Sequence, residues 1–266
     1  MNSSDQHHRS AWLQGPSAEC PEVPEPLEHP WRLVLLGAPG VGKGTQADLL
    51  TRHMGACHLS TGDLFRQAKT RSEREQTLAM SAALNFMRRG ALVPDSIVWD
   101  MIRERTSCLR CAGGFVLDGF PRTLAQAQAL KVLLESERLS LDAVVNYELP
   151  VVEIVARLSG RRTCEKCRAI FHQTAHPPQI EGVCDHCSGA LYQREDDRPE
   201  AIAVRLEAYA NSTTPLIEFY RKLGLLVTVA ARGSPEAICE RTVAEVQARS
   251  RFVAECRCEQ RAGFAS

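Results

Sequence analysis

A glycine-rich segment with one lysine runs from Gly37 to Thr45 and reads Gly-Ala-Pro-Gly-Val-Gly-Lys-Gly-Thr. It follows the apolar run 33–36 and precedes a helical pattern, which is the strand–turn–helix setting of a phosphate-binding loop. Where side chains are absent, backbone N–H groups can turn inward onto an anion, and the next helix points its positive end at the same place. Lys43 would reach the β- and γ-phosphates. The segment therefore predicts binding of a nucleoside triphosphate.

Four cysteines form two Cys-x-x-Cys pairs, Cys164 with Cys167 and Cys184 with Cys187, separated by 16 residues. Each pair offers two thiolates to one ion, and two pairs complete a tetrahedron around zinc. Because four thiolates leave no open position, the zinc would be structural, replacing the core that so short a segment lacks. The alternative is four free thiols. We expect the nearby histidines to be surface or turn residues and not ligands: His172, His176 and His186.

The remaining cysteines carry less information. The chain has 11 in total, an odd number, which fits a reducing compartment and metal binding better than secretion and disulfides. We therefore predict a cytoplasmic protein. A third pair, Cys108 and Cys111, has no partner pair, and we expect it in the turn before a strand without a function of its own. A second metal site or a redox site is the alternative.

Polar residues also follow two other predicted strands. Thr61, after the second strand, can hydrogen-bond a base edge, and Arg66 on the next helix can point its planar guanidinium at a phosphate. Asp118, at the end of the third strand, suits water-mediated binding of Mg²⁺. Since ligands of parallel sheets bind at the carboxyl ends of the strands, these residues should face the glycine loop.

The segment after Asp118 adds groups of the same kind. Gly119 permits close backbone approach, and Arg122 supplies a second guanidinium. Gln126 lies one helical turn later on the same face, where its amide can read a base. Phosphoryl transfer requires positive groups around the migrating phosphoryl and little else from the protein. Further arginines are therefore candidates: Arg157, Arg161, Arg162, Arg194 and Arg205.

Apolar runs alternate with helical patterns, which predicts an α/β fold with a parallel sheet covered by helices on both faces. Two stretches interrupt the alternation, and we expect both to be insertions over the active face: 60–93, which is helical and polar, and 160–197, which is rich in cysteine, histidine and proline. The predicted strands are 32–36, 56–59, 114–117, 143–148 and 225–229. The predicted helices are 45–53, 96–105, 124–137, 151–158, 199–223 and 235–248.

The composition excludes several function classes. Of 266 residues, 32 are basic and 32 acidic, so no net positive field favours nucleic acid or a membrane surface. No apolar run approaches the roughly 20 residues that span a bilayer. The proline-rich segment 1–30 lacks the features of a signal or transit peptide and is predicted to be a disordered arm. The tail 249–266 has no clear structural signal.

These motifs together resemble adenylate kinase, in its long form with a zinc-bearing lid, from about residue 31 to 248. Three shared motifs surround the predicted strands: Gly-Ala-Pro-Gly-Val-Gly-Lys-Gly-Thr-Gln at 37–46, Ser-Thr-Gly-Asp-Leu at 60–64, and Phe-Val-Leu-Asp-Gly-Phe-Pro-Arg-Thr at 115–123. The lid cysteines, Gly-Arg-Arg at 160–162 and Gln-Arg-Glu-Asp-Asp at 193–197 complete the set.

The resemblance implies a P-loop NTPase-type core with a five-stranded parallel sheet, a helical monophosphate-binding insertion at 60–93 and a zinc-ribbon lid at 160–197. It implies a monomer that transfers a phosphoryl group from MgATP to AMP to give two ADP. The implied catalytic residues are Lys43, Arg122, Arg161, Arg194 and Arg205. The implied ATP-binding residues are Gly40, Val41, Gly42, Lys43, Gly44, Thr45, Arg157, Arg161, Ile170, Phe171 and Gly233. The implied AMP-binding residues are Thr61, Arg66, Val93, Gly119, Arg122, Gln126, Arg194 and Arg205.

The chain also departs from the pattern of that family. Arg168 and Ser188 stand where glycines commonly follow the lid cysteine pairs, which predicts strain in those turns and weaker metal binding. The insertion is a few residues longer near 70–76. The loop after the last strand, 230–233, lacks an acidic residue often found there.

Three other functions compete with this interpretation. A pyrimidine monophosphate kinase usually carries alanine where Thr61 stands and has a short lid without four cysteines. A relative that uses GTP on AMP fits the same motifs. A non-catalytic nucleotide sensor, with the zinc segment as an interaction module, would bind ATP without turnover when AMP is present.

Overall fold

The structure is a computed structural model that describes residues 12–13, 29–68, 76–88, 93–167 and 169–262, with the backbone alone at 66–68, 87–88 and 252–262. Its centre is a five-stranded parallel sheet in the order β2-β3-β1-β4-β8. The strands are β1 (Trp31–Gly37), β2 (Cys57–Ser60), β3 (Gly114–Asp118), β4 (Ala143–Glu148) and β8 (Leu226–Ala230). The predicted sheet is confirmed, and each strand lies within one or two residues of its predicted range.

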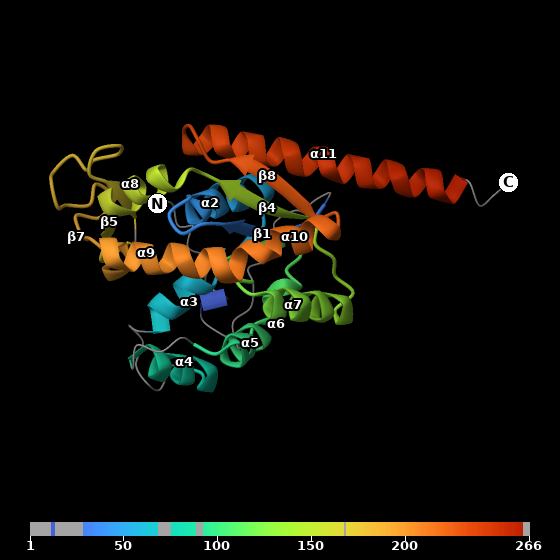
Figure 1. Ribbon diagram of the computed structural model, residues 1–266, viewed down its shortest axis with the longest axis horizontal. Helices are drawn as coiled ribbons and strands as arrows, with labels where there is room; N and C mark the ends of the chain where they lie inside the picture. The colour runs from blue at the N-terminus through green and yellow to red at the C-terminus, as the bar shows by residue number, and fades with distance from the viewer. Residues whose placement is uncertain (1–11, 14–28, 69–75, 89–92, 168, 263–266) are drawn as a thin grey trace.

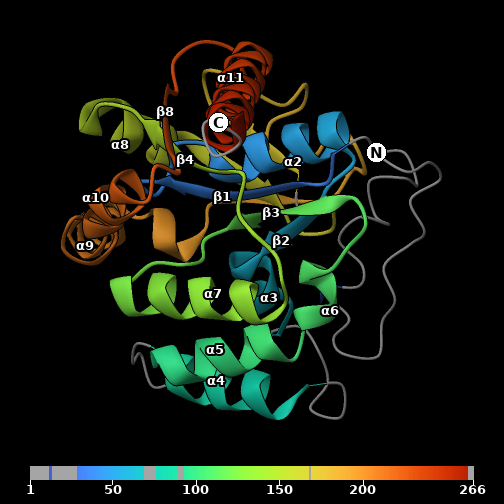
Figure 2. The ribbon, with the colours of Figure 1, turned by 90° about the vertical axis from the view of Figure 1, so that its right-hand side faces the viewer.

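Helices cover both faces of this sheet, as the sequence predicted (Figure 2). Alternate residues of β1 point to opposite faces, so Leu33 and Leu35 join one apolar cluster while Val34 and Leu36 join another. The first cluster is completed by α2 (Lys43–Met54) and α11 (Pro235–Ala262). The second is completed by α7 (Leu124–Ser136), α10 (Thr214–Lys222) and the helices of the insertion.

The described residues of the insertion predicted at 60–93 are mostly helical, as expected. The insertion contains α3 (Thr61–Ala68) and α4 (Leu78–Arg88), followed by α5 (Asp95–Arg103) and the short α6 (Thr106–Leu109). In both ribbon views α4 and α5 lie on the far side of α3 and α7 from α11 (Figures 1 and 2). The insertion shares its apolar cluster with the core, since Ala79 and Met80 pack in the same cluster as Leu117 of β3.

The predicted lid follows α8 (Val151–Gly160) and projects from one end of the molecule (Figure 1). It is an antiparallel sheet in the order β6-β5-β7, made of β5 (Arg161–Cys164), β6 (Ile170–His172) and β7 (Leu191–Tyr192). The 3₁₀ turn η2 (Glu195–Asp197) leads from the lid into α9 (Pro199–Ala208). The bounds predicted for the lid, 160–197, therefore begin at the last residue of α8 and end with η2.

One predicted helix is interrupted. The range 199–223 divides into α9, a π-helical turn η3 (Tyr209–Thr213) and α10. Pro215 lies in the first turn of α10, and it lacks the N–H that a continuous helix would donate to the carbonyl four residues earlier. The wider turn accommodates this loss. The prediction of one continuous helix over 199–223 was therefore wrong at residues 209–213.

The last helix is longer than predicted. The tail 249–266 was expected to have no clear structure, but α11 continues to Ala262 and extends beyond the sheet (Figure 1). Good helix formers such as Ala, Glu, Gln and Arg fill much of the tail, and no glycine or proline occurs before Gly263. Arg249 attaches the helix to the core by donating to the carbonyls of Gly224 and Asp142. Among the described residues, no helix is both long and apolar enough to cross a membrane.

Most of the predicted arm 1–30 lies outside the described residues, but residues 12–13 and 29–30 are placed. Trp12 and Leu13 form a short helical segment beside α3 (Figure 1). The Trp12 side chain is only 1% exposed and belongs to the same apolar cluster as the insertion. The sequence pattern did not predict this packing.

Two glycines with left-handed backbones provide a test of this fold. Gly114 opens β3 at φ +80°, and a Cβ there would lie 2.1 Å from the carbonyl oxygen of Trp31. Gly224 has φ +66° with open space around it. We expect Gly114→Ala to lower the free energy of unfolding by about 2–5 kcal/mol, against about 1–2 kcal/mol for Gly224→Ala, because only the first adds a backbone clash. Urea denaturation measures both, and equal losses would contradict the close approach of β1 and β3.

Candidate functional site

The glycine loop joins the carboxyl end of β1 to the amino end of α2. Gly40 and Gly42 have φ of +84° and +107°, which side chains rarely adopt, so these two glycines permit the turn. A Cβ at Gly40 would also lie 2.5 Å from the side chain of Leu158. Val41 is 2% exposed and packs in the core, which anchors the loop. Gly44 and Thr45 occupy the first turn of α2, where the backbone N–H groups and the helix dipole favour an anion.

Lys43 is held inside this loop. Its Nζ donates to the carbonyl oxygens of Gly37, at 2.6 Å, and Ala38, at 3.0 Å. Burial is the largest cause that lowers the pKa of Lys43 to about 8. The charge of Asp118 opposes the shift, while three arginines add to it: Arg122, Arg205 and Arg161. These four groups therefore lie within electrostatic reach of Lys43, so residues distant in sequence gather at the loop.

Asp118 ends β3 beside the glycine loop. Its Oδ2 lies 3.6 Å from the position that a Cβ on Gly44 would take, so it faces the start of α2. Burial alone would raise the pKa of Asp118, but neighbouring His58, followed by Lys43 and Arg122, lowers it. His58 Nε2 lies 3.7 Å from Asp118 Oδ2, and its Nδ1 is 3.0 Å from Asp48 Oδ1. The carboxylate is thus kept ionised where a cation could meet it through water.

Next to Asp118 lie the first predicted acceptor-site residues. Thr61 Oγ1 donates to the carbonyl of Asp118 at 3.4 Å, and a Cβ on Gly119 would lie 2.8 Å from that same hydroxyl oxygen. Arg122 Nε donates to the carbonyl of Gly119 at 2.7 Å. Glycine at 119 therefore lets Thr61 approach the strand end, and the structure brings the predicted Thr61, Gly119 and Arg122 together.

Gln126 is fixed by two neighbours. Its Oε1 accepts from the backbone N–H of Arg122 at 2.7 Å, and its Nε2 donates to Asp95 Oδ1 at 2.7 Å. The other carboxylate oxygen of Asp95 accepts from Thr123 Oγ1 at 2.8 Å. Since Thr123 also caps α7, Asp95 joins the start of α5 to the start of α7. Asp95 orients Gln126 and was missed by the sequence pattern.

Two other predicted AMP residues are described in less detail. Val93 is half-buried and packs against the same apolar cluster as the insertion, directly before α5. The backbone of Arg66 lies in α3, but its side chain falls outside the described residues.

The predicted lid arginines converge on one carboxylate. Asp197, which is fully buried, accepts from Arg161 Nε at 2.7 Å and from Arg161 Nη2 at 2.6 Å. Arg205 Nη1 donates to Asp197 Oδ1 at 3.3 Å and to the carbonyl of Asp196 at 2.7 Å. A two-pronged carboxylate contact holds a guanidinium plane in one orientation. Asp197 thus holds Arg161, at the start of the lid, and Arg205, on α9 after the lid.

The other predicted arginines of this region have different partners. Arg194 Nε donates to Thr163 Oγ1 at 2.9 Å, within the lid. Arg162 Nη1 donates to the carbonyl of Arg161, which keeps Arg162 at the start of the lid. Both arginines therefore contact β5, the first strand of the lid.

Of the remaining residues predicted to bind ATP, Arg157 contacts the glycine loop. Arg157 donates to the carbonyl of Val41 at 3.2 Å and to that of Ala231 at 2.9 Å, so it joins the loop to the segment after β8. Gly233, with φ +104°, lies in that same segment. In the lid, Ile170 is 45% exposed, whereas the Phe171 side chain is buried with the lid cysteines. Phe171 could therefore meet a donor only through its backbone.

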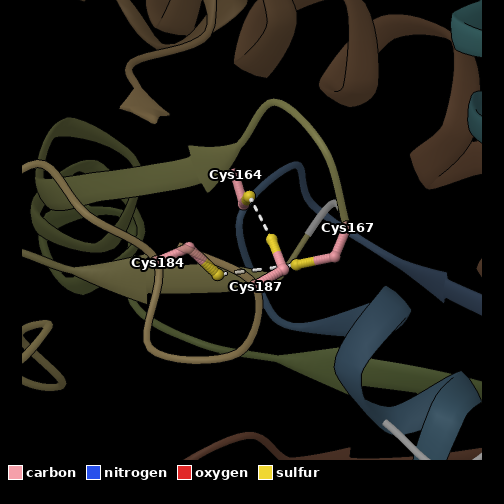
Figure 3. A group of neighbouring side chains, drawn as sticks. All are labelled: Cys164, Cys167, Cys184 and Cys187. Atoms are coloured by element: carbon pink, nitrogen blue, oxygen red, sulfur yellow. Dashed lines mark hydrogen bonds between the residues drawn. The ribbon is translucent and has the colours of Figure 1, made fainter. Parts of the chain in front are cut away.

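The four lid cysteines face one another across the turns of the lid (Figure 3). Their sulfur atoms all lie within 4.8 Å of each other, with Cys164 and Cys187 at 3.4 Å and Cys167 and Cys184 at 3.5 Å. Burial would raise the pKa of the Cys164 thiol, but backbone N–H groups pointing at it lower that pKa to about 6. The predicted grouping of four thiols is confirmed, and within the described residues it is the one cluster of candidate metal ligands.

The turns that hold the cysteines contain the predicted departure from glycine. Ser188 has φ +53°, a left-handed conformation that costs a serine about 1–2 kcal/mol. Its backbone N–H donates to the carbonyl of Cys184 at 2.9 Å, so the turn closes in spite of that strain. Arg168, the other substituted position, lies outside the described residues.

Comparison with known proteins decides the family. The adenylate kinase family profile matches residues 35–225. The chain belongs to the adenylate kinase family. It is 50% identical to an adenylate kinase of Caldicellulosiruptor bescii over 196 residues, which are 74% of this chain and 89% of the relative. It is 44% identical to an adenylate kinase of Streptomyces griseus over 218 residues, 82% of this chain and 98% of the relative. An adenylate kinase of Carboxydothermus hydrogenoformans is 46% identical over 207 residues, 78% and 95% of the two chains.

The third cysteine pair of this adenylate kinase family member lies where it was predicted, at the turn before β3. Cys108 is on α6, and Cys111 follows it, with Cys111 Sγ 3.0 Å from Cys57 Sγ at the start of β2. All three are buried in the core shared with the insertion.

Proposed function

We propose that this protein is an ATP:AMP phosphotransferase, which converts MgATP and AMP reversibly into two ADP and so maintains the adenine nucleotide balance. Family membership supports the reaction class. The observation that carries the assignment is that Arg122, Arg161 and Arg205 lie within electrostatic reach of Lys43 in the glycine loop. The backbone of Arg122 also contacts Gln126, so the positive groups lie next to both the donor loop and the proposed acceptor residues.

Each group has a task in this reaction. The loop amides and Lys43 hold the donor phosphates, while Thr61 and the oriented amide of Gln126 read the acceptor base. Arg122 and Arg161 would hold the phosphates for in-line attack by an acceptor oxygen and offset the charge that develops. No protein nucleophile is required, because the acceptor itself attacks.

Two further parts of the site serve the same step. Mg²⁺, bound with ATP, would neutralise charge on the phosphates, and the ionised Asp118 beside Gly44 fits a residue that holds it through water. The lid arginines and Asp197 connect the lid to the site, so lid closure would exclude water as a competing acceptor.

The decisive experiment offers MgATP with AMP, UMP, CMP, GMP or no acceptor, and measures ADP formation. We expect turnover with AMP, because Thr61 and Gln126 present hydrogen-bonding groups suited to adenine. Lys43→Met should lower that turnover at least about 100-fold while the protein stays folded. Turnover with UMP or CMP would make the protein a pyrimidine kinase. ATP binding without turnover on any acceptor would support a sensor, and a parallel series with MgGTP tests the donor.

The lowered pKa of Lys43 gives a pH dependence of donor binding. In the free protein the Lys43 side chain is mostly the charged ammonium below pH 8. Above pH 8 it is mostly the neutral amine, which burial favours. A bound triphosphate restores the charge, so ATP binding should take up protons, and the uptake should grow as the pH rises from 7 to 9. Calorimetry in two buffers of different ionisation enthalpy measures this. Uptake that persists in Lys43→Met would contradict the assignment.

We further propose that the lid cysteines bind a structural zinc ion. A tetrahedron with Zn–S bonds of ~2.3 Å places sulfurs about 3.8 Å apart, close to the 3.4 and 3.5 Å between the paired thiols. The apolar cluster inside the lid contains only Phe171 and two of the cysteines as fully buried members, so a metal would supply most of the cohesion.

The zinc proposal predicts about one zinc ion per chain and a lower melting temperature after treatment with a chelator. Cys184→Ser should lose the metal and the chelator effect. Cys239→Ser removes a buried thiol of α11 outside the lid and should retain both. Purified protein without metal, and with a melting curve that a chelator does not move, would show free thiols instead.

We also propose that the enzyme acts as a monomer in the cytoplasm. The resemblance to adenylate kinase suggests a monomer, and a reducing compartment would keep the lid thiols available for metal. Sedimentation at a mass near 29.4 kDa would agree with a monomer, and twice that mass would contradict it.

A further inference from the structure

A buried tryptophan from the N-terminal arm lies against the acceptor side of the site. Trp12 precedes the family match at 35–225, yet its side chain is 1% exposed. Its apolar cluster includes Leu59 of β2, Leu64 of α3 and Met80 of α4. Leu59 belongs to β2, an edge strand of the central sheet, so the tryptophan packs where the sheet ends on this side.

The indole N–H makes one polar contact, with the residue that precedes Thr61. Trp12 Nε1 donates to the carbonyl oxygen of Ser60 at 3.0 Å. That carbonyl belongs to the planar peptide unit joining Ser60 to Thr61, so holding the oxygen also sets the backbone direction of Thr61. On the other side, Ser60 Oγ accepts from the N–H of Asp63 in the first turn of α3. The contact thus fixes the point where β2 ends and the insertion begins.

A buried arginine extends this contact to two other helices. Arg105, fully buried after α5, donates through Nε to the carbonyl of Trp12 at 2.8 Å and through Nη1 to that of Met101 at 2.8 Å. Its Nη2 lies 3.6 Å from the sulfur of Met80 on α4. The arm, α4 and α5 are therefore joined through one guanidinium. α5 also carries Asp95, which orients Gln126.

We propose that Trp12 is a positioning residue of the acceptor site. It holds the Ser60–Thr61 peptide directly and, through Arg105, the helices that support Gln126, so the N-terminal arm contributes to AMP recognition. This inference rests on the proposed ATP:AMP activity. It concerns binding of the acceptor, because the glycine loop, Lys43 and Arg157 have none of their described hydrogen bonds with this group of residues.

The test is steady-state kinetics of Trp12→Phe, which keeps an aromatic ring and removes the N–H donor. Loss of a hydrogen bond that fixes the Thr61 backbone should raise KM for AMP about fivefold to tenfold, while kcat and KM for ATP change less than about twofold. Trp12→Ala should raise KM for AMP further. The matched control is Trp31→Phe at the start of β1, which should leave all three constants unchanged.

The outcomes separate this inference from the proposed function. A wild-type protein without AMP turnover would overturn both. An active wild type, with the same KM for AMP in Trp12→Phe and Trp12→Ala, would overturn the positioning role alone. Equal losses in kcat and in both KM values would show a general structural role and also contradict it.

Fluorescence provides a second measurement that does not depend on turnover. The chain has three tryptophans, so the double variant Trp31→Phe with Trp99→Phe leaves Trp12 as the sole indole emitter. We expect emission typical of a buried indole, poorly quenched by acrylamide, and a change in intensity on addition of AMP that ATP does not produce. Emission typical of an exposed indole would contradict the packing. A buried indole that does not respond to AMP would contradict the coupling to the acceptor site.

Discussion

The site depends on holding several positive charges close together before any anion is bound. Lys43 is buried, and its charged form is disfavoured further by the arginines around it: Arg122, Arg205 and Arg161. Two carboxylates offset this repulsion. Asp118 acts on Lys43 beside the loop, and Asp197 pairs with Arg161 and Arg205 at the base of the lid. Much of the remaining architecture is the framework that brings these groups together from α2, β3, the loop before α7, the lid and α9.

The parts of this arrangement that are local in sequence could be predicted. The glycine-rich motif predicts the strand before it and the helix after it. Each strand of the core is likewise a short apolar run between helical patterns. The spacing of the two Cys-x-x-Cys pairs likewise predicted a single cluster, and the structure places all four sulfurs together. Residues at the carboxyl ends of parallel strands meet at one edge of the sheet, so the proximity of Asp118 to the loop also followed from topology.

The residues that were missed act through contacts between distant segments. Asp95 lies 31 positions before Gln126, and Trp12 lies 48 positions before Ser60. Neither has a local pattern that distinguishes it from a helix-cap aspartate or an isolated aromatic residue. The break at η3 and the extension of α11 were missed for a different reason. Periodicity shows where apolar residues recur but does not detect a missing N–H at Pro215, and it loses its signal where a helix leaves the core.

Asp197 shows how one carboxylate can hold two arginines in a fixed orientation. It engages Nε and Nη2 of Arg161, so the donor that it does not engage, Nη1, remains for a phosphate without breaking the ion pair. Asp197 is fully buried, so removing Arg161 would leave its charge poorly compensated, which favours keeping the pair intact. The guanidinium therefore needs little reorganisation when substrate arrives, and that is the condition under which a charged group lowers a reaction barrier. In this account the lid contributes an oriented charge as well as a cover.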